Sequence, residues 1–183
     1  MSTLTTPRLV LRPLERDDVD ALWPYVSDPD LPRFMSWDPH RDRAETEAFI
    51  AAVVAGRQEG KGHVWIIRHD DVLVGVIGLE DIVRTMRAWR QDRGEIGYWC
   101  GPPFQNRGFV TEAAREVMRF GFEDVGLHKI RIGCVSDNAP SRHVIEKLGF
   151  RFVGEERDHF FRYGRWWNHR AYEMIIDEWR ARG

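Results

Sequence analysis

The sequence is poor in cysteine and has no long apolar run. With only Cys100 and Cys134 among its 183 residues, the chain cannot build the disulfide framework of a small secreted protein. No apolar stretch approaches the roughly 18 to 20 residues that a membrane-spanning helix needs. Residues 1–10 also lack the basic-then-apolar layout of a secretory signal. We therefore expect a cytoplasmic protein with reduced thiols that is not bound to a membrane.

The sequence also lacks an excess of either charge. The formal net charge is -2 at pH 7, so the composition gives no reason to expect nucleic acid as a partner. Hydrophobic residues make up 43% of the chain, which is typical of a globular protein. The length suits one domain over residues 1–183, and neither repeats nor linkers divide it.

Several common site motifs are absent. The stretch GRQEGKG at 56–62 is one residue short of a nucleotide-binding P-loop, and Gly62 stands where Ser or Thr would bind magnesium. No G-x-G-x-x-G follows a predicted strand, and no G-x-S-x-G nucleophile elbow occurs. The histidines and cysteines show no metal-ligand spacing, so we expect no metal site.

Apolar periodicity predicts one mixed α/β domain. The clearest signal is a strongly amphipathic helix over about Val110–Val125, with apolar residues at i, i+3, i+4 and i+7. The stretch 84–93 is polar and rich in arginine and is expected to be a connection, whereas the prolines of 27–40 indicate a loop with one helical turn. The remaining expected elements are helices after Asp17 or Asp18, over 43–56 and over 141–148, and strands around Leu9 and Leu11 and near 63–69, 72–81, 94–101, 129–135, 151–158 and 170–177.

The stretch QNRGFVTEAAREVM, Gln105 to Met118, is the candidate for an anion-binding loop. Gly108 separates a predicted strand from the helix, and a helix N-terminus offers unpaired N–H groups and about half a positive charge. Glycine lets the backbone approach a ligand closely, and Arg107 adds a cation. The alternative is that Gly108 only permits a tight turn, and a lone glycine does not decide between the two.

The segment EIGYWCGPPFQNRGFVTEAAREVMRFGFEDVGLHKIRIGCVSDNAPSRHVIEKLGF, residues 95–150, resembles the core of the GCN5-related N-acetyltransferases (GNAT). It is most similar to the RimJ/RimL-like branch, which contains the ribosomal-protein N-terminal acetyltransferases. TPRLVLRPLERDD resembles the first strand of that branch, SDPDLPRFMSWDPH with the following ETEAFI its substrate-side helices, and FRYGRWWNHRAYEMIIDEW its C-terminal hairpin. The resemblance implies an acyltransferase that uses acetyl-CoA. It also implies an α/β fold of the α+β type, with a mixed, mostly antiparallel central sheet of about seven strands flanked by helices.

The resemblance also implies a coenzyme site. The family's loop pattern is Gln or Arg, two residues, Gly, one residue, then Gly or Ala; Gln105 and Gly108 match it, and Val110 departs from it. Pro102 and Pro103 are expected to end the preceding strand, so that the strands can splay around the pantetheine arm. The residues implied to contact acetyl-CoA are Tyr98, Trp99, Cys100, Gln105, Asn106, Arg107, Gly108, Phe109, Val110, Thr111, Asn138 and Ser141.

Two residues are candidates for the chemistry. Glu95 occupies a position that resembles that of the general base, although an ordinary glutamate pKa of about 4.3 calls for burial or a relaying water. The alternative is an exposed glutamate paired with an arginine, for example Arg93. The family's frequent thiolate partner, a tyrosine, is replaced here by Ile145, whereas Asn138 and Ser141 match the Asn-x-x-Ser of the RimL-like branch.

Asn138 would bind the pantetheine amides and Ser141 the sulfur. The alternative is that both residues merely start a helix beside Pro140.

The acceptor amine is the least constrained part of the prediction. An N-terminal α-amine has a pKa of about 7.7 to 8.0 and lysine one of about 10.4, so deprotonating lysine costs roughly 3 to 4 kcal/mol more. A weak base therefore favours a protein or peptide N-terminus. The alternatives are a small-molecule amine (polyamine, amino acid or aminoglycoside) and a non-catalytic acyl-CoA-binding module that regulates a partner. The resemblance further suggests a homodimer.

Overall fold

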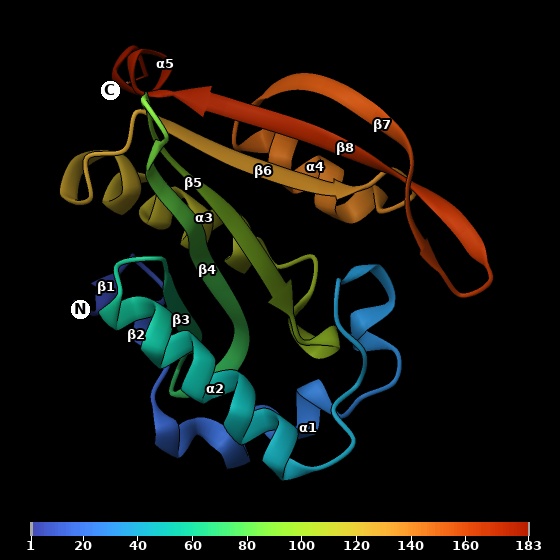
Figure 1. The fold of residues 1–183 in the computed structure, drawn as a ribbon. Helices are drawn as coiled ribbons and strands as arrows, with labels where there is room; N and C mark the ends of the chain where they lie inside the picture. The colour runs from blue at the N-terminus through green and yellow to red at the C-terminus, as the bar shows by residue number, and fades with distance from the viewer. Residues whose placement is uncertain (1, 183) are drawn as a thin grey trace.

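The fold is built on one eight-stranded sheet (Figure 1). The structure is a computed structural model that describes residues 2–182. The strand order is β1-β2-β3-β4-β5-β6-β8-β7, and every neighbouring pair is antiparallel except β5 and β6, which are parallel. The strands are β1 Leu4–Thr5, β2 Val10–Pro13, β3 His63–His69, β4 Val72–Met86, β5 Trp89–Cys100, β6 Lys129–Val135, β7 Arg151–Arg162 and β8 Arg165–Ile175.

Helices cover both faces of the sheet (Figure 1). They are α1 Val19–Val26, α2 Arg43–Gln58, α3 Phe109–Arg119, α4 Ala139–Lys147 and α5 Ile176–Arg180. Helices α1 and α2 pack on one face and α3 and α4 on the other, which gives two apolar clusters. Among residues 2–182, no helix combines the length and the apolar character needed to cross a bilayer.

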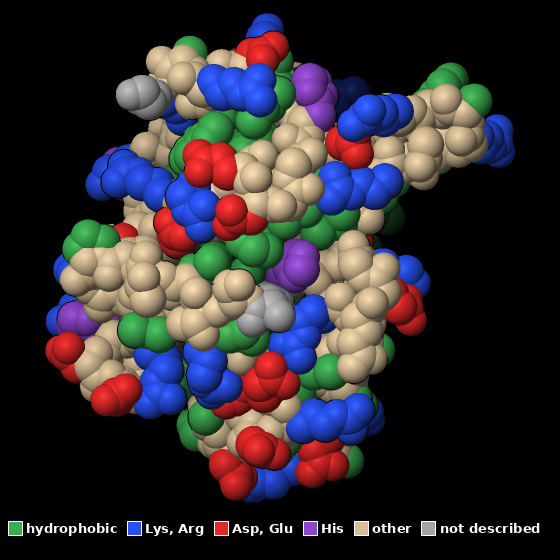
Figure 2. All heavy atoms as spheres, turned by 90° about the vertical axis from the view of Figure 1, so that its left-hand side faces the viewer, with side chains coloured by type: hydrophobic (Ala, Val, Ile, Leu, Met, Phe, Trp, Pro, Cys, Tyr) green, Lys and Arg blue, Asp and Glu red, His purple; other side chains and the backbone are tan. Residues whose placement is uncertain are grey.

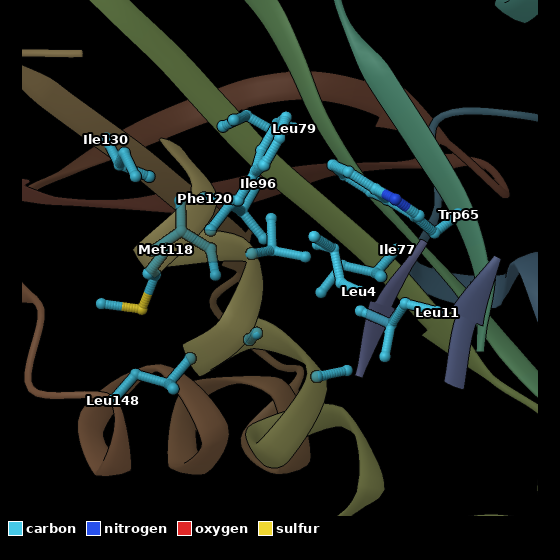
Figure 3. Close-up of a cluster of buried hydrophobic side chains, with 14 of the residues drawn as sticks. Leu4, Leu11, Trp65, Ile77, Leu79, Ile96, Met118, Phe120, Ile130 and Leu148 are labelled. Atoms are coloured by element: carbon cyan, nitrogen blue, oxygen red, sulfur yellow. The ribbon is translucent and has the colours of Figure 1, made fainter. Parts of the chain in front are cut away.

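The apolar stripe of α3 builds the larger cluster. Ala113, Ala114 and Val117 are fully buried, as the helical periodicity predicts. Figure 3 shows Met118 and Phe120 among the side chains of this cluster. The smaller cluster joins Trp99 on β5 to α1 and α2. The face in Figure 2 carries acidic and basic side chains interspersed rather than gathered by sign.

The predicted connection over 84–93 was wrong, because the structure forms a long β-hairpin there. Strand β4 continues to Met86 and β5 begins at Trp89, with Arg87 in a left-handed conformation at the turn (φ 56°). Asp92 is buried and forms ion pairs with Arg84 and Arg90. Backbone hydrogen bonds hold this ladder and its side chains are mostly polar, so the apolar alternation that signals a strand is missing.

The sheet also has eight strands rather than about seven. The additional edge strand β1 consists of only Leu4–Thr5, which is too short to give a pattern. Strand β7 extends beyond its predicted end and β8 begins before its predicted start, so both reach a tight turn at Tyr163 and Gly164. Strand β8 ends at Ile175, immediately before α5, rather than at 177. Residues of β7 are largely exposed, so periodicity could not define the length of that strand.

Candidate active site

The parallel strands β5 and β6 separate in the middle of the sheet. They pair from Arg93 opposite Lys129 to Ile96 opposite Ile132, and no further pairing between them occurs in the described residues. Beyond Ile96, β5 stays bonded to β4 and β6 to β8, so the two strands diverge (Figure 1). The separation begins well before Pro102, so the prolines end β5 without causing the splay. The divergence leaves backbone groups on facing edges that an extended ligand can pair with.

The loop between β5 and α3 exposes backbone at the helix start. Gly108 is the N-cap of α3 with φ 78°, and Asn106 is also left-handed with φ 60°. Residues 105–108 are exposed, whereas Phe109 and Val110 are buried. Gly108 therefore forms the tight strand-to-helix turn that both interpretations of the sequence require. A Cβ built on Gly108 would have only the Arg8 Nη2 nearby, at 3.5 Å, so the backbone at Gly108 is open to a ligand, and the helix start that follows it is of the kind that binds phosphate.

Side chains of the predicted motif hold the loop in its conformation and leave its backbone exposed. Gln105 donates through Nε2 to the carbonyl oxygen of Cys100 at 3.2 Å, which ties the loop to the end of β5. Val110, where the sequence departs from the family pattern, buries its side chain. Thr111 is half-buried in the first turn of α3. The departure at Val110 therefore leaves the exposed backbone of the loop open.

Arg8 is a loop residue that the sequence analysis missed. Its Nη1 donates to the carbonyl oxygen of Arg107 at 3.2 Å, and its Nε lies 2.6 Å from a carboxylate oxygen of Glu112. The guanidinium groups of Arg8 and Arg107 both lie 4.9 Å from the centre of the Phe109 ring. Arg8 precedes the loop by about a hundred residues, so no local pattern could have linked them.

Glu112 places a negative charge in the first turn of α3. Partial burial acts to raise the pKa of Glu112, but hydrogen bonds from Thr6 and Arg8 outweigh it and lower the pKa. The carboxylate is therefore ionised at neutral pH, and Arg8 offsets its charge next to the loop that was predicted to bind an anion.

A pair of hydroxyl groups bridges β5 and α4. The Tyr98 hydroxyl lies 2.8 Å from Oγ of Ser141. Burial raises the pKa of Tyr98 to about 12, against a smaller lowering by the hydrogen bond to Ser141, so Tyr98 keeps its proton. Asn138 caps α4 by accepting from the Ser141 N–H at 3.2 Å, which is the helix-start role considered as the alternative. Ile145 is fully buried in the core.

Glu95 lies on the face of the sheet opposite α3, next to the separation of the strands. The closest arginine is Arg131 on β6, whose Nη1 lies 4.0 Å from a Glu95 carboxylate oxygen. Arg93, the partner considered from the sequence, donates instead to Gln91 at 2.9 Å. Glu95 is half-buried and therefore remains accessible to a ligand on this face.

Glu80 on β4 stands directly opposite Glu95 in the antiparallel ladder. Directly opposed residues of a ladder project to the same face, so the structure brings two carboxylates together. Part of the Glu80 side chain is exposed, yet the surrounding protein raises its pKa, and the charges of Asp81 and Glu95 raise it further. The sequence analysis missed Glu80, because only the strand register places it beside Glu95.

The two cysteines form no disulfide, as expected. Burial raises the pKa of Cys100 to about 11 and also raises the pKa of Cys134. Both groups are therefore protonated thiols at neutral pH and are poor nucleophiles. Trp99 points into the smaller cluster, 5.5 Å from the Tyr25 ring, so only its backbone is available at the strand edge.

We call the face of the sheet that carries Glu80 and Glu95 the open face, and the C-terminal hairpin lies beside it. Arg162, near the tip of β7, donates to the carbonyl oxygen of Trp37 and to the Asp38 carboxylate, both at 2.8 Å. Arg165 pairs with Asp137 at 2.8 Å, immediately before the start of α4. The hairpin thereby holds both the loop after α1 and the turn that carries the start of α4.

A sequence model of the family described as an acetyltransferase (GNAT) domain matches residues 8–151. The chain is 29% identical over 176 residues to the uncharacterized N-acetyltransferase YnaD of Bacillus subtilis (strain 168), covering 96% of this chain and 98% of that protein. It is 30% identical over 161 residues to the uncharacterized N-acetyltransferase p20 of Bacillus licheniformis, covering 87% and 88%. With the spermidine N(1)-acetyltransferase of Escherichia coli (strain K12) it shares 26% identity over 166 residues, covering 91% and 84%.

Solved structures show the same architecture. The RimL ribosomal L7/L12 α-N-protein acetyltransferase in complex with coenzyme A matches with a TM-score of 0.88 at 21% identity, over 97% of this chain and 99% of that one. The microcin C7 self-immunity acetyltransferase MccE, in complex with acetyl-CoA and AMP, matches with a TM-score of 0.83 at 20% identity, over 93% and 94%. At these identities the likeness concerns the fold.

Proposed function

Because the chain belongs to the GNAT acetyltransferase family and is therefore an acetyl-CoA-dependent N-acetyltransferase, we propose that it acetylates the N-terminal α-amine of a protein or peptide. The observation that carries this proposal is the accessible carboxylate face at the separation of β5 and β6. A cationic amine is attracted to this face, which lies beside the strand edges that can hold an extended ligand.

We assign the parts of acetyl-CoA to the backbone groups that the structure leaves exposed. We assign the phosphates of acetyl-CoA to the N–H groups from Arg107 to Thr111 at the start of α3. The pantetheine arm pairs with the free edge of β5 from Tyr98 to Cys100. Asn138 uses one amide oxygen lone pair to cap α4 and keeps its amide N–H groups for the pantetheine. Bound in this way, acetyl-CoA supplies the activated acetyl group.

The reacting groups lie on opposite sides of the strand separation. A carboxylate of the open face, of which Glu95 is the one that the sequence indicates, accepts the proton of the amine. Ser141, hydrogen-bonded to Tyr98, donates a hydrogen bond to the sulfur as negative charge develops there. The high pKa of Tyr98 keeps a proton within this hydroxyl pair at neutral pH.

The pKa of the acceptor favours an α-amine over a lysine. Deprotonating lysine at neutral pH costs roughly 3 to 4 kcal/mol more than deprotonating an α-amine, and the side-chain carboxylates of the open face are weak bases. The fold of the ribosomal-protein acetyltransferase RimL, an α-N-protein acetyltransferase, agrees with this choice. Both arguments concern the class of amine and leave the protein acceptor open.

A polyamine acceptor is the second candidate. The spermidine N(1)-acetyltransferase shares 26% identity over 91% of this chain. Glu80 and Glu95, side by side, provide the paired negative charge that a polycation would bind. We further infer a cytoplasmic location and a homodimeric state. Sedimentation of the purified protein tests the homodimeric state.

The test measures release of the free CoA thiol from acetyl-CoA against a panel of amines. The panel contains peptides with free N-termini, lysine peptides with blocked N-termini, spermidine and an aminoglycoside. A calorimetric titration of acetyl-CoA runs beside it. Turnover restricted to the free N-termini supports the proposal, whereas turnover of spermidine alone selects the second candidate. Binding of acetyl-CoA without turnover of any free N-terminal peptide contradicts the proposed acceptor.

A further inference from the structure

We propose that Glu80 is a catalytic residue of this enzyme: its carboxylate, at the point where β5 and β6 separate, accepts the proton that the amine loses. Glu95 then acts through Glu80, as a neighbouring negative charge that makes Glu80 a stronger base. The assignment rests on the proposed function, because it names the proton acceptor of the same site.

The position of the Glu80 carboxylate is the first argument. A Cβ built on Gly97 would lie 3.8 Å from Glu80 Oε2, and Gly97 is the first residue of β5 beyond its pairing with β6. The Glu80 carboxylate therefore lies at the point where β5 and β6 begin to separate, which is where the acetyl group of a donor bound between the strands would lie. Glu95 lies two residues before Gly97, where β5 is still paired with β6, and its carboxylate is 4.0 Å from the Arg131 guanidinium.

The local backbone leaves room for this orientation. Gly78 and Gly97 are opposite each other in the ladder, so neither strand raises a side chain between Glu80 and the opening. A Cβ on Gly78 would lie only 2.6 Å from Glu80 Oε2, so the glycine is what allows the carboxylate to fold over the sheet. The left-handed Asp81 (φ 48°) and the break in register after Glu80 mark a β-bulge that aims this side chain.

The charges around Glu80 make it a better base than an isolated glutamate. The surrounding protein makes the largest contribution to raising the pKa of Glu80, and the charges of Asp81 on the same strand and Glu95 on β5 raise it further. The nearby cations have other partners: Arg131 faces Glu95, and Lys61, on the turn before β3, pairs with Glu59 at 2.5 Å. Among the ion pairs within residues 2–182, none includes Glu80. A carboxylate with a raised pKa and no cation bound to it is a stronger base than an ordinary glutamate.

The proton balance of the step is simple. The ammonium form of the amine gives one proton to the Glu80 carboxylate, which becomes a carboxylic acid. The nitrogen lone pair forms the bond to the acetyl carbon, and the bond between that carbon and sulfur breaks. The sulfur leaves with the electron pair of that bond and takes the second nitrogen-bound proton through the Ser141 hydroxyl. The products are the amide and the CoA thiol, and Glu80 returns its proton to solvent.

Kinetics of single variants test the assignment with the amine found active in the panel. Glu80→Gln is expected to lower kcat/KM for the amine by roughly 10² to 10⁴, the range of a positioned base, while the Kd for acetyl-CoA stays unchanged. Glu95→Gln is expected to lose less, and to move the acidic limb of the pH–rate profile to lower pH, because removal of the like charge lowers the pKa of Glu80. Glu173→Gln is the matched control, since this carboxylate projects from the same sheet but pairs with Lys129 at 2.7 Å.

Two results would overturn the assignment. One is a Glu80→Gln enzyme with the rate and pH profile of the wild type. The other is a loss in Glu95→Gln as large as that in Glu80→Gln with no shift of the acidic limb, which would make Glu95 the acceptor. Gly78→Ala adds a test without removing charge: it displaces the Glu80 carboxylate and should lower kcat while leaving the Kd for acetyl-CoA unchanged.

Failure of the proposed function is recognised separately. If the wild type binds acetyl-CoA but turns over no amine, the proposed acceptor has failed. Carboxyl NMR titration of the intact protein then decides the inference by itself. The Glu80 signal is expected to show a pKa above the ordinary glutamate value and a lower pKa in Glu95→Gln. An identical Glu80 pKa in the wild type and in Glu95→Gln would remove the basis of the assignment.

Discussion

The hydroxyl oxygen of Tyr98 and Oγ of Ser141 lie 2.8 Å apart, although the two residues are more than forty positions apart in the sequence. This contact joins β5 to the start of α4 on the face of the sheet that α3 and α4 cover. Burial keeps Tyr98 protonated, with its pKa raised to about 12. Ser141 can therefore donate its own proton to a ligand while it accepts one from Tyr98.

Replacing Ser141 by alanine tests this arrangement. Ser141→Ala should slow turnover by about 10- to 150-fold, because a hydrogen bond to a charged group contributes about 1.5 to 3 kcal/mol. Tyr98→Phe should cost less, since the Ser141 hydroxyl stays in place. Thiol release gives kcat, and calorimetry gives the Kd for acetyl-CoA. Equal losses in turnover and in affinity after Ser141→Ala would make Ser141 a binding residue only.

The loop before α3 predicts a strong effect of Gly108→Glu on coenzyme binding. The substitution places a like charge at the proposed phosphate position and forces a bulky residue to adopt φ 78°. We expect the affinity for acetyl-CoA to fall below detection in calorimetry. Gly60→Glu is the matched control, because Gly60 has φ 70° and open space around it but lies at the end of α2. Undiminished affinity in Gly108→Glu would contradict the loop assignment.

Arg8 and Glu112 predict a compensating pair. Arg8→Ala leaves the Glu112 carboxylate without its main cation in the first turn of the helix where the anion is expected to bind. The Kd for acetyl-CoA should rise about tenfold, equivalent to about 1.4 kcal/mol. Adding Glu112→Gln removes the repelling charge, so the double variant should recover part of the affinity. Simple additivity of the two single substitutions in calorimetry would show that they do not interact.

The fold could be predicted where side chains report burial. The helix that became α3 was visible because Ala113, Ala114 and Val117 face the sheet, and β6 was predicted with the bounds it has, Lys129–Val135. The hairpin at Arg87 could not be predicted, because its ladder is formed by backbone groups and its side chains are mostly solvated. Patterns of apolar residues carry no information about such a ladder.

The candidate site divides in the same way. Gln105 and Gly108 form a local motif, and the structure places them in the predicted strand-to-helix turn; their role in binding the coenzyme stays a prediction. Arg8 and Glu80 could not be identified beforehand, and Tyr98 was expected to contact acetyl-CoA but not to form a hydrogen bond with Ser141, because these contacts join residues that are distant in the sequence. Those contacts depend on strand register and on side-chain direction, which single-sequence patterns do not define.

Stability should fall as the pH drops through the titration of His63. This residue starts β3 and lies 5.1 Å from the Phe120 ring, and its buried Nδ1 has no hydrogen-bond partner within residues 2–182. Burial lowers the pKa of His63, and the positive charge of Arg57 lowers it further. Below about pH 6.5, the ordinary pKa of histidine, the unfolded chain therefore binds more protons than the folded one, so the free energy of unfolding decreases as the pH falls towards the folded-state pKa. His63→Phe removes the proton-binding group and fills the same aromatic contact, so its unfolding free energy, measured by urea titration between pH 8 and pH 5.5, should decline less than that of the wild type; an identical decline would show that His63 is not a source of the pH dependence.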